Sequence, residues 1–328
     1  MKQAMVDAPL GDDVFGDDPT VQRLEAMVAE RLNKEAAVFV TSGTQSNLLA
    51  LMSHCGRGDE YIVGDQAHCY GWEGGGAAVL GSIQPQVVPM LADGLPDPVA
   101  IANAVKPEDP HFARTKVVCL ENTKDGIVQS VARMEEATDV ARARGLATHL
   151  DGARMWNTAV ALGIDGATLT APFDTVSLCL SKGLGAPMGS VLSGPAALIG
   201  EARKYRKMLG GGLRQVGMVA AAGIHALDHH VERLADDHAN AAALAEALDA
   251  IDGIEIREQN TNMVFCTAGQ VDPAVLTDAM EAAGVLALWY STPDGTTETR
   301  LVTHLDVSTS DLELVANAVE QALAHCSD

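Results

Sequence analysis

The sequence predicts an α/β protein, with a large domain built on a mainly parallel sheet and a small α+β domain after it. Between residues 36 and 194, short runs rich in β-branched residues alternate with helical segments of about ten residues. This alternation is typical of βαβ crossovers, which cover a parallel sheet on both faces. After Asp252-Gly253 the pattern changes to short strands around two helices. We therefore place the large domain at residues 1–240 and the small domain at 241–328.

The elements of the large domain follow from its apolar runs. The expected strands are Ala36–Val40, Tyr61–Gly64, Val117–Glu121, Leu146–Leu150, Thr175–Leu180 and Ser190–Ser193. The expected helices are Thr44–Cys55, Met134–Arg144, Ala153–Leu162, Pro195–Leu209 and Arg214–Leu248. Gly145 directly follows the expected helix Met134–Arg144, in the position where a glycine commonly ends a helix.

The small domain is predicted in the same way. Its expected strands are Ile254–Arg257, Asn262–Cys266, Val285–Trp289 and Thr299–His304. Its expected helices are Pro273–Ala283 and Ser310–Ala324.

Composition narrows the class of protein. A formal net charge of −22 argues against nucleic acid or an anionic membrane as a partner. The apolar runs are too short to span a bilayer and no secretory signal opens the chain, so we expect a cytoplasmic protein. The six cysteines have no CxxC spacing, and those in apolar runs (Cys119, Cys179 and Cys266) are expected to be buried. We expect no metal.

The first candidate site follows the strand Ala36–Val40, where the segment 41–47 opens a helix. Free backbone N–H groups and the helix dipole make such an end suitable for a phosphate. An ordinary capped helix start would have the same sequence.

Two further candidates end expected strands, at the edge where open α/β sheets bind ligands. Asp151 follows one strand, with Arg154 three residues later; the simpler interpretation is a helix cap and a surface arginine. Lys182, one of only eight lysines, ends another strand before a glycine-rich turn. A buried lysine there would be a reactive amine, whereas an exposed one would be ordinary.

Together these features indicate pyridoxal 5′-phosphate as the cofactor. It requires a phosphate cradle, a carboxylate such as Asp151 at its ring nitrogen, and a lysine such as Lys182 that forms an imine with its aldehyde. His68 follows the strand Tyr61–Gly64 and could stack on the ring. A lone histidine is also often structural.

At this point the chain resembles a known family, the low-specificity L-threonine aldolases. The matching stretches, in the order of that family, are residues 11–20, 42–44, 66–68, 120–123, 149–154, 181–185, 206–215 and 300–306. The resemblance implies the aspartate-aminotransferase-like fold of type I pyridoxal-phosphate enzymes, with a seven-stranded sheet in the large domain. It also implies a homo-oligomer, built as a dimer of dimers, that acts on a small amino acid.

The resemblance also implies roles at the cofactor. Lys182 is the imine-forming lysine, Asp151 pairs with the ring nitrogen and His68 stacks on the ring. The residues implied to hold the phosphate are Ser42, Gly43 and Thr44.

Four basic residues complete the implied site. Arg154 and Arg300 lie near the ring hydroxyl and the substrate carboxylate, which arginine binds well through paired hydrogen bonds. Lys207 and Arg214 belong to a segment that reaches the neighbouring subunit's cofactor site.

Three departures from the family concern the substrate side. A segment that precedes Gly11 in the family is absent, Phe15 replaces a tyrosine, and Lys124 replaces a histidine. The implied reaction is retro-aldol cleavage of L-threonine, L-allo-threonine or a related β-hydroxy-α-amino acid to glycine and an aldehyde. His68, Lys124 or a water between them could be the base.

Two alternatives stay open. The first alternative is an amino-acid racemase or β-eliminating lyase of the same family, because Lys124 offers a second amine. A binding protein without activity is the second, which the intact Lys182, Asp151 and His68 disfavour.

Overall fold

The computed structural model describes residues 1–326, and of residues 325 and 326 only the backbone. The chain forms two compact units, Met1–Val231 and a second that begins at Glu232, and each is described here by itself. Residue 240, where the sequence suggested the boundary, lies inside helix α12 (Leu234–Asp249).

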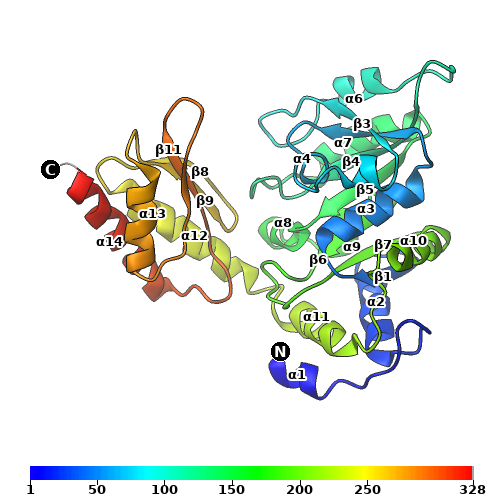
Figure 1. The fold of residues 1–328 in the computed structure, drawn as a ribbon, viewed down its shortest axis with the longest axis horizontal. Helices are drawn as coiled ribbons and strands as arrows, with labels where there is room; N and C mark the ends of the chain where they lie inside the picture. Colours follow the sequence, from blue (N-terminus) through cyan, green and yellow to red (C-terminus); the bar gives the residue numbers. More distant parts are fainter. Residues whose placement is uncertain (327–328) are drawn as a thin grey trace. The chain divides into compact units, whose positions relative to one another are not determined.

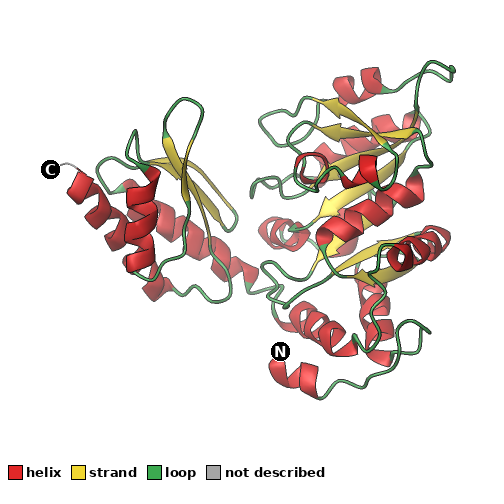
Figure 2. Cartoon of the chain, in the orientation of Figure 1, coloured by secondary structure: helices red, strands yellow, loops and turns green. Residues whose placement is uncertain are grey.

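The first unit is built on a seven-stranded sheet (Figures 1 and 2). In chain order its strands are β1 (Ala36–Val40), β2 (Asp59–Gly64), β3 (Gln84–Val88), β4 (Arg114–Glu121), β5 (Ala147–Gly152), β6 (Thr175–Cys179) and β7 (Ser190–Gly194). Their order across the sheet is β1-β7-β6-β5-β4-β2-β3. The strands from β3 to β6 run parallel, and β7 is antiparallel to both β6 and β1. The mainly parallel seven-stranded sheet is therefore confirmed.

Eleven helices of the described chain accompany this sheet. They are α1 (Lys2–Val6), α2 (Pro19–Arg31), α3 (Gly43–His54), α4 (His68–Gly71), α5 (Gly76–Val79), α6 (Pro98–Ala104), α7 (Val131–Ala143), α8 (Met155–Leu162), α9 (Gly166–Thr170), α10 (Ala196–Met208) and α11 (Gly217–His229). The helix that matters for the site is α3, which packs on β5, β6 and β7 and is seen along its length in Figure 1. Its buried face brings Ser46 and Asn47 to the sheet.

Two predictions for the first unit were wrong. Strand β3 was missed because it contains Pro85, and proline is tolerated in a sheet only on edge strands, which is where β3 lies. The expected helix Arg214–Leu248 is two helices, α11 and α12, separated by a turn in which Nδ1 of His230 is hydrogen-bonded to the carbonyl of Leu184 at 2.7 Å. Two aspartates in the first turn of α12, a known start signal, mark where the second helix begins.

Up to residue 326, the second unit combines a four-stranded antiparallel sheet with three helices (Figure 2). Its elements are α12 (Leu234–Asp249), β8 (Glu255–Asn260), β9 (Met263–Thr267), α13 (Pro273–Ala282), β10 (Trp289–Ser291), β11 (Thr297–Val302) and α14 (Thr309–Cys326). The sheet order is β10-β11-β9-β8, and an apolar core that includes Leu248, Leu276 and Met280 lies between sheet and helices.

The expected strand Val285–Trp289 is only partly correct, because strand β10 begins at its last residue. Gly284, with φ at 78°, ends helix α13, and the N–H of Val285 bonds the carbonyl of Met280 in that cap. The next residues are therefore displaced from the sheet, and Leu286 is 93% exposed. The α+β character of the unit agrees with the sequence prediction.

Candidate active site

The carboxyl ends of β5 and β6 place two of the predicted groups on neighbouring strands. Asp151 stands opposite Ser177 in the parallel register and is 2% exposed. Its carboxylate accepts hydrogen bonds from the N–H of Ala153 at 3.1 Å and from Nδ2 of Asn47 at 2.8 Å. Both donors are neutral, and no cationic side chain of the described chain forms an ion pair with this buried carboxylate.

Lys182 follows β6 by three residues and is exposed. The turn after it closes with a hydrogen bond of 2.8 Å from the N–H of Gly185 to the carbonyl of Lys182, and Gly185 has a φ of 73°, which favours glycine. The amine is thus held at the same sheet edge as Asp151, free of an ion pair within the described residues. The burial predicted for a reactive lysine is absent in the isolated chain.

The start of α3 has the features of an anion site. Ser42 caps the helix by accepting from the N–H of Gln45 at 3.1 Å, and Ser42 and Thr44 are exposed. The N–H groups of Gly43 and Thr44 have no hydrogen-bond partner among the described residues. Behind them, the hydroxyl of Ser190 is buried and unpartnered, 3.7 Å from where a Cβ on Gly43 would lie.

His68 begins helix α4 and is held from two directions. Its N–H donates to Oε2 of Glu121 at 2.9 Å, and its Nδ1 lies 3.0 Å from Oε1 of Glu73. The side chain is 40% exposed, whereas that of Glu73 is 6% exposed. The Nε2 atom of His68 has no hydrogen-bond partner in the described chain, so one ring nitrogen is available to a ligand.

Burial and mutual repulsion among the carboxylates determine the electrostatics of this site. Burial, and then the charge of Asp151, raises the pKa of Glu121 to about 7. Burial likewise raises the pKa of Glu73. The hydrogen bond to Glu73 raises the pKa of His68, and the nearby Lys182 ammonium opposes that rise. His68 therefore lies within electrostatic reach of both Asp151 and Lys182.

Sequence reasoning missed two residues that tie the site together, Asn47 and Glu73. Nδ2 of Asn47 lies 2.8 Å from both Oε1 of Glu73 and Oδ2 of Asp151. In the sequence, Asn47 stood out only within the segment 41–47 that opens α3, and Glu73 was not singled out. Asn47 lies in the first buried turn of a helix, and Glu73 follows a candidate histidine. Both are weak signals in the sequence, because the role of each residue depends on contacts between distant parts of the chain.

Ligand atoms of His68, Glu73 and Asp151 lie within 4.8 Å of one another, a spacing that could also hold a metal ion. The amide of Asn47 donates hydrogen bonds to both of these carboxylates, so a hydrogen-bond donor already lies beside them. The expectation of no metal stays a prediction.

Lys124 lies in a tight turn after β4, with Lys124 and Ile127 forming an isolated bridge. Its side chain is 12% exposed and its amine pairs with the carboxylate of Asp125. The charge of Lys124 partly opposes the rise in the pKa of Glu121, so Lys124 lies near the carboxylates of the site.

The remaining basic residues are distributed more widely. Arg154 precedes helix α8 and is partly buried, three residues after Asp151. Arg214 pairs with Asp12 of its own chain at 2.8 Å, so that side chain has an intramolecular target. Lys207 is exposed and forms no ion pair with a described residue, and Arg300 lies on β11 of the second unit.

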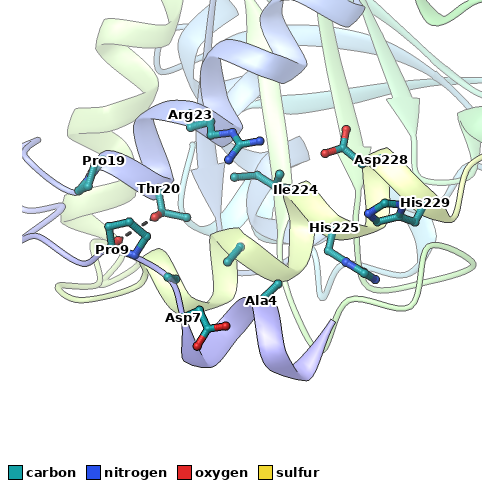
Figure 3. A pocket seen from close by; sticks show the side chains of 12 residues that line it. Ala4, Asp7, Pro9, Pro19, Thr20, Arg23, Ile224, His225, Asp228 and His229 are labelled. Atoms are coloured by element: carbon teal, nitrogen blue, oxygen red, sulfur yellow. Dashed lines mark hydrogen bonds between the residues drawn. The ribbon is translucent and has the colours of Figure 1, made fainter.

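Neither of two cavities coincides with the strand ends. Figure 3 shows the first, of about 460 Å³, which is lined by residues of α1, α2 and α11 that include Arg23, His225 and Asp228. None of the predicted site residues lines it. The second, of about 470 Å³, is formed by the second unit and includes Arg300.

Comparison with known proteins identifies the class. Residues 1–270 match the family described as "Beta-eliminating lyase", and the chain belongs to that family of pyridoxal-phosphate-dependent lyases. Solved structures share the fold: a putative L-allo-threonine aldolase from Listeria monocytogenes superposes with a TM-score of 0.81 at 22% identity, covering 98% of this chain and 92% of that one.

Particular relatives are closer in sequence. The chain is 50% identical over 316 residues to the low specificity L-threonine aldolase of Escherichia coli (strain K12), which covers 96% of this chain and 93% of the relative. It is 40% identical over 333 residues to a probable low-specificity L-threonine aldolase 2 of Arabidopsis thaliana, covering 98% and 92%.

Proposed function

We propose that this chain is a pyridoxal-phosphate-dependent aldolase that cleaves L-threonine, L-allo-threonine or a related β-hydroxy-α-amino acid to glycine and an aldehyde. One observation carries the proposal: the buried carboxylate of Asp151 has only neutral donors, and the Lys182 amine follows the adjacent strand. The relatives named low-specificity L-threonine aldolase support the choice of substrate class.

The residues at the strand ends fit the cofactor. When bound, pyridoxal phosphate supplies a protonated ring that accepts the electron pair released when a bond to the substrate's α-carbon breaks. Asp151 would hold the ring nitrogen, which would give its buried charge a cationic partner. Ser42, Gly43 and Thr44 would hold the phosphate at the free N–H groups of α3, where the unpartnered Ser190 hydroxyl also lies. Lys182 would hold the aldehyde.

The chain's own acid–base groups would handle the substrate's β-hydroxyl proton. His68 is fixed through Nδ1 by Glu73, which leaves Nε2 to face a ligand. Lys124, paired with Asp125, or a water between it and His68 is the other candidate for that proton. Arg154 and Arg300 would bind the substrate carboxylate and orient the bond that breaks.

The proposal includes a homo-oligomer, in which Lys207 and Arg214 contribute to a neighbouring subunit's site. Large apolar side chains of the first unit support such contacts, since Phe15, Trp72 and Met208 are each more than 70% exposed. Sedimentation velocity should give a dimer or tetramer, and an active monomer would contradict this part.

We place the protein in the cytoplasm. Five described cysteines are free and buried, which suits a reducing compartment. No helix in residues 1–326 combines the length and apolar character needed to cross a bilayer.

An aldehyde-release assay tests the activity. The purified chain, loaded with pyridoxal phosphate, is given L-threonine, L-allo-threonine and L-phenylserine, and glycine and aldehyde are both quantified. Equal amounts of the two products support the aldolase. Inversion at the α-carbon without aldehyde would support a racemase, and a keto acid with ammonia would support a β-eliminating lyase.

A further inference from the structure

A continuous run of buried and partly buried polar side chains leads from the end of α3 to the two carboxylates of the site. Oδ1 of Asn47 lies 3.2 Å from Nε2 of His149, and Nδ1 of His149 lies 2.9 Å from the hydroxyl of Thr175. The same hydroxyl lies 2.8 Å from Nε2 of His54. His149 and Asp151 are two residues apart on β5 and so face the same side, toward α3.

The donors and acceptors that each side chain offers fix the direction of every hydrogen bond from Thr175 to the carboxylates. The ionised carboxylates of Glu73 and Asp151 can only accept, so the amide NH₂ of Asn47 must face them and its oxygen must face His149. That oxygen needs a donor, which requires the proton of His149 to be on Nε2. Nδ1 of His149 then accepts from the hydroxyl of Thr175.

His149 is neutral in this arrangement. It is completely buried, and burial, with the neighbouring His54, lowers the pKa of His149 to about 3. A neutral imidazole has one donor and one acceptor, which is the combination that its two neighbours require. The first residue of the run, His54, is neutral for a similar reason, because burial lowers its pKa to about 4.

We propose that Asn47 is a positioning residue of the site, and that His149 fixes which end of the Asn47 amide faces the carboxylates. Held this way, one NH₂ group keeps Asp151 and Glu73 in place, and through Glu73 it keeps His68 in place. A reversed amide would put an oxygen against two carboxylates and a donor against a donor. The effect on the cofactor rests on the proposed function, whereas the orientation is a property of the protein alone.

The orientation is tested without the cofactor. Nitrogen NMR of the full-length protein, labelled at histidine, distinguishes protonated from unprotonated ring nitrogens, and the signals of His149 are those lost in His149→Gln. We expect Nε2 protonated and Nδ1 unprotonated at neutral pH. A proton on Nδ1, or on both nitrogens, would overturn the proposal.

The positioning role is tested by an isosteric change. Asn47→Asp replaces the NH₂ group with an oxygen and so places a third carboxylate beside those of Asp151 and Glu73. The dissociation constant for pyridoxal phosphate, measured by protein fluorescence, should rise about tenfold or more. The matched control is Asn262→Asp, since Asn262 is also buried but its Nδ2 donates to a backbone carbonyl of the second unit. Unchanged affinity in Asn47→Asp would overturn the role. A parent chain that binds no cofactor would instead overturn the proposed function, while the NMR result still decides the orientation.

A pair of variants isolates His149. His149→Gln retains a donor for the Asn47 oxygen, whereas His149→Phe keeps bulk and removes the donor. We expect parent-like cofactor affinity in the first and weakened affinity in the second. Equal loss in both would show that His149 acts through packing, and would overturn its assigned part.

Discussion

The two units of the chain bury polar side chains in different ways. In the second unit they bond mainly to the backbone: Asn262 donates to the carbonyl of Thr303, and the hydroxyl of Thr303 donates to that of Asp237. At the site of the first unit they bond to one another, from Asn47 to Glu73 and Asp151. Bonds to the backbone fix the path of the chain, whereas side-chain networks fix reacting groups relative to one another.

This contrast has an energetic consequence. The second unit's remaining core is apolar, so its stability follows the area it buries. At its site the first unit buries the carboxylate of Asp151 with neutral donors only, and burying charge without a cation is costly. We expect changes at the strand ends to remove function at little cost in stability, and changes in the second unit's core to do the reverse.

The largest effect is expected from Lys182→Ala. Loss of the amine should abolish aldehyde release and leave the urea midpoint unchanged, because the side chain is exposed. Borohydride reduction of the loaded parent enzyme, followed by peptide mapping, should place the cofactor on Lys182. The exposed Lys204, paired with Glu201, provides a matched Lys204→Ala control that should stay active. Label on Lys124 or Lys207 would contradict the assignment.

Asp151→Asn should be nearly as severe. A neutral amide does not stabilise a protonated ring nitrogen, so turnover should fall about 10²- to 10³-fold while some cofactor still binds. Steady-state kinetics and cofactor titration measure the two effects separately. In the second unit Asp237, which pairs with Arg233, gives the comparison: Asp237→Asn should lower the unfolding free energy instead. Normal turnover in Asp151→Asn would mean that Asp151 only caps a helix.

Leu276→Ala tests the apolar side of the contrast. Leu276 is fully buried between α13 and the second sheet, and its truncation should lower the free energy of unfolding by about 2–5 kcal/mol. Urea unfolding followed by circular dichroism measures this. A loss well below that range would mean that the second unit's core is less tightly packed than its burial indicates.

Glu121→Gln tests the cost of buried charge in the first unit. Because the folded protein raises the pKa of Glu121 to about 7, it binds more protons than the unfolded chain between about pH 4.5 and 7. This carboxyl's contribution to stability is therefore present at low pH and lost as pH rises through that window, by up to about 3 kcal/mol. In the cofactor-free protein the variant should show a smaller decline in stability from pH 5 to 8. Identical slopes would argue that Glu121 titrates normally.

The same contrast explains what the sequence could predict. Asp151, Lys182 and His68 were proposed from the sequence because each lies at or shortly after the end of a strand, and parallel strands bring such positions to one edge. Asn47 and Glu73 act through contacts between elements distant along the chain, and no local pattern marks such contacts. His149 was noted only as part of the stretch around Asp151, since its role depends on its cross-strand partner Thr175.

The fold was predicted where hydrophobic pattern and turn signals agreed. Strand β1 was predicted with its observed bounds, and α3 to within one residue at each end. The wrong predictions came where tertiary structure overrode the local pattern. Examples are Pro85 on an edge strand, Val285 in a helix cap and the turn around His230. The segment 206–215 was expected to reach a neighbouring subunit, and no sequence pattern indicated that its Arg206 forms a buried pair with Asp13 of the same chain at 2.9 Å.

The smallest effect is expected at Lys124, which lies at the margin of the first unit's network. Its amine pairs with the carboxylate of Asp125 and lies within electrostatic reach of Glu121. An imidazole in its place could take up the proton of a β-hydroxyl near neutral pH. We therefore expect Lys124→His to shift the pH optimum downward and to raise activity on L-threonine relative to the natural substrate. Asp125→Asn, which removes the partner but keeps the amine, is the matched control and should leave the substrate ranking as it is. If Lys124→His changes neither the pH profile nor the ranking, Lys124 belongs with the solvated surface pairs and not with the network that positions His68.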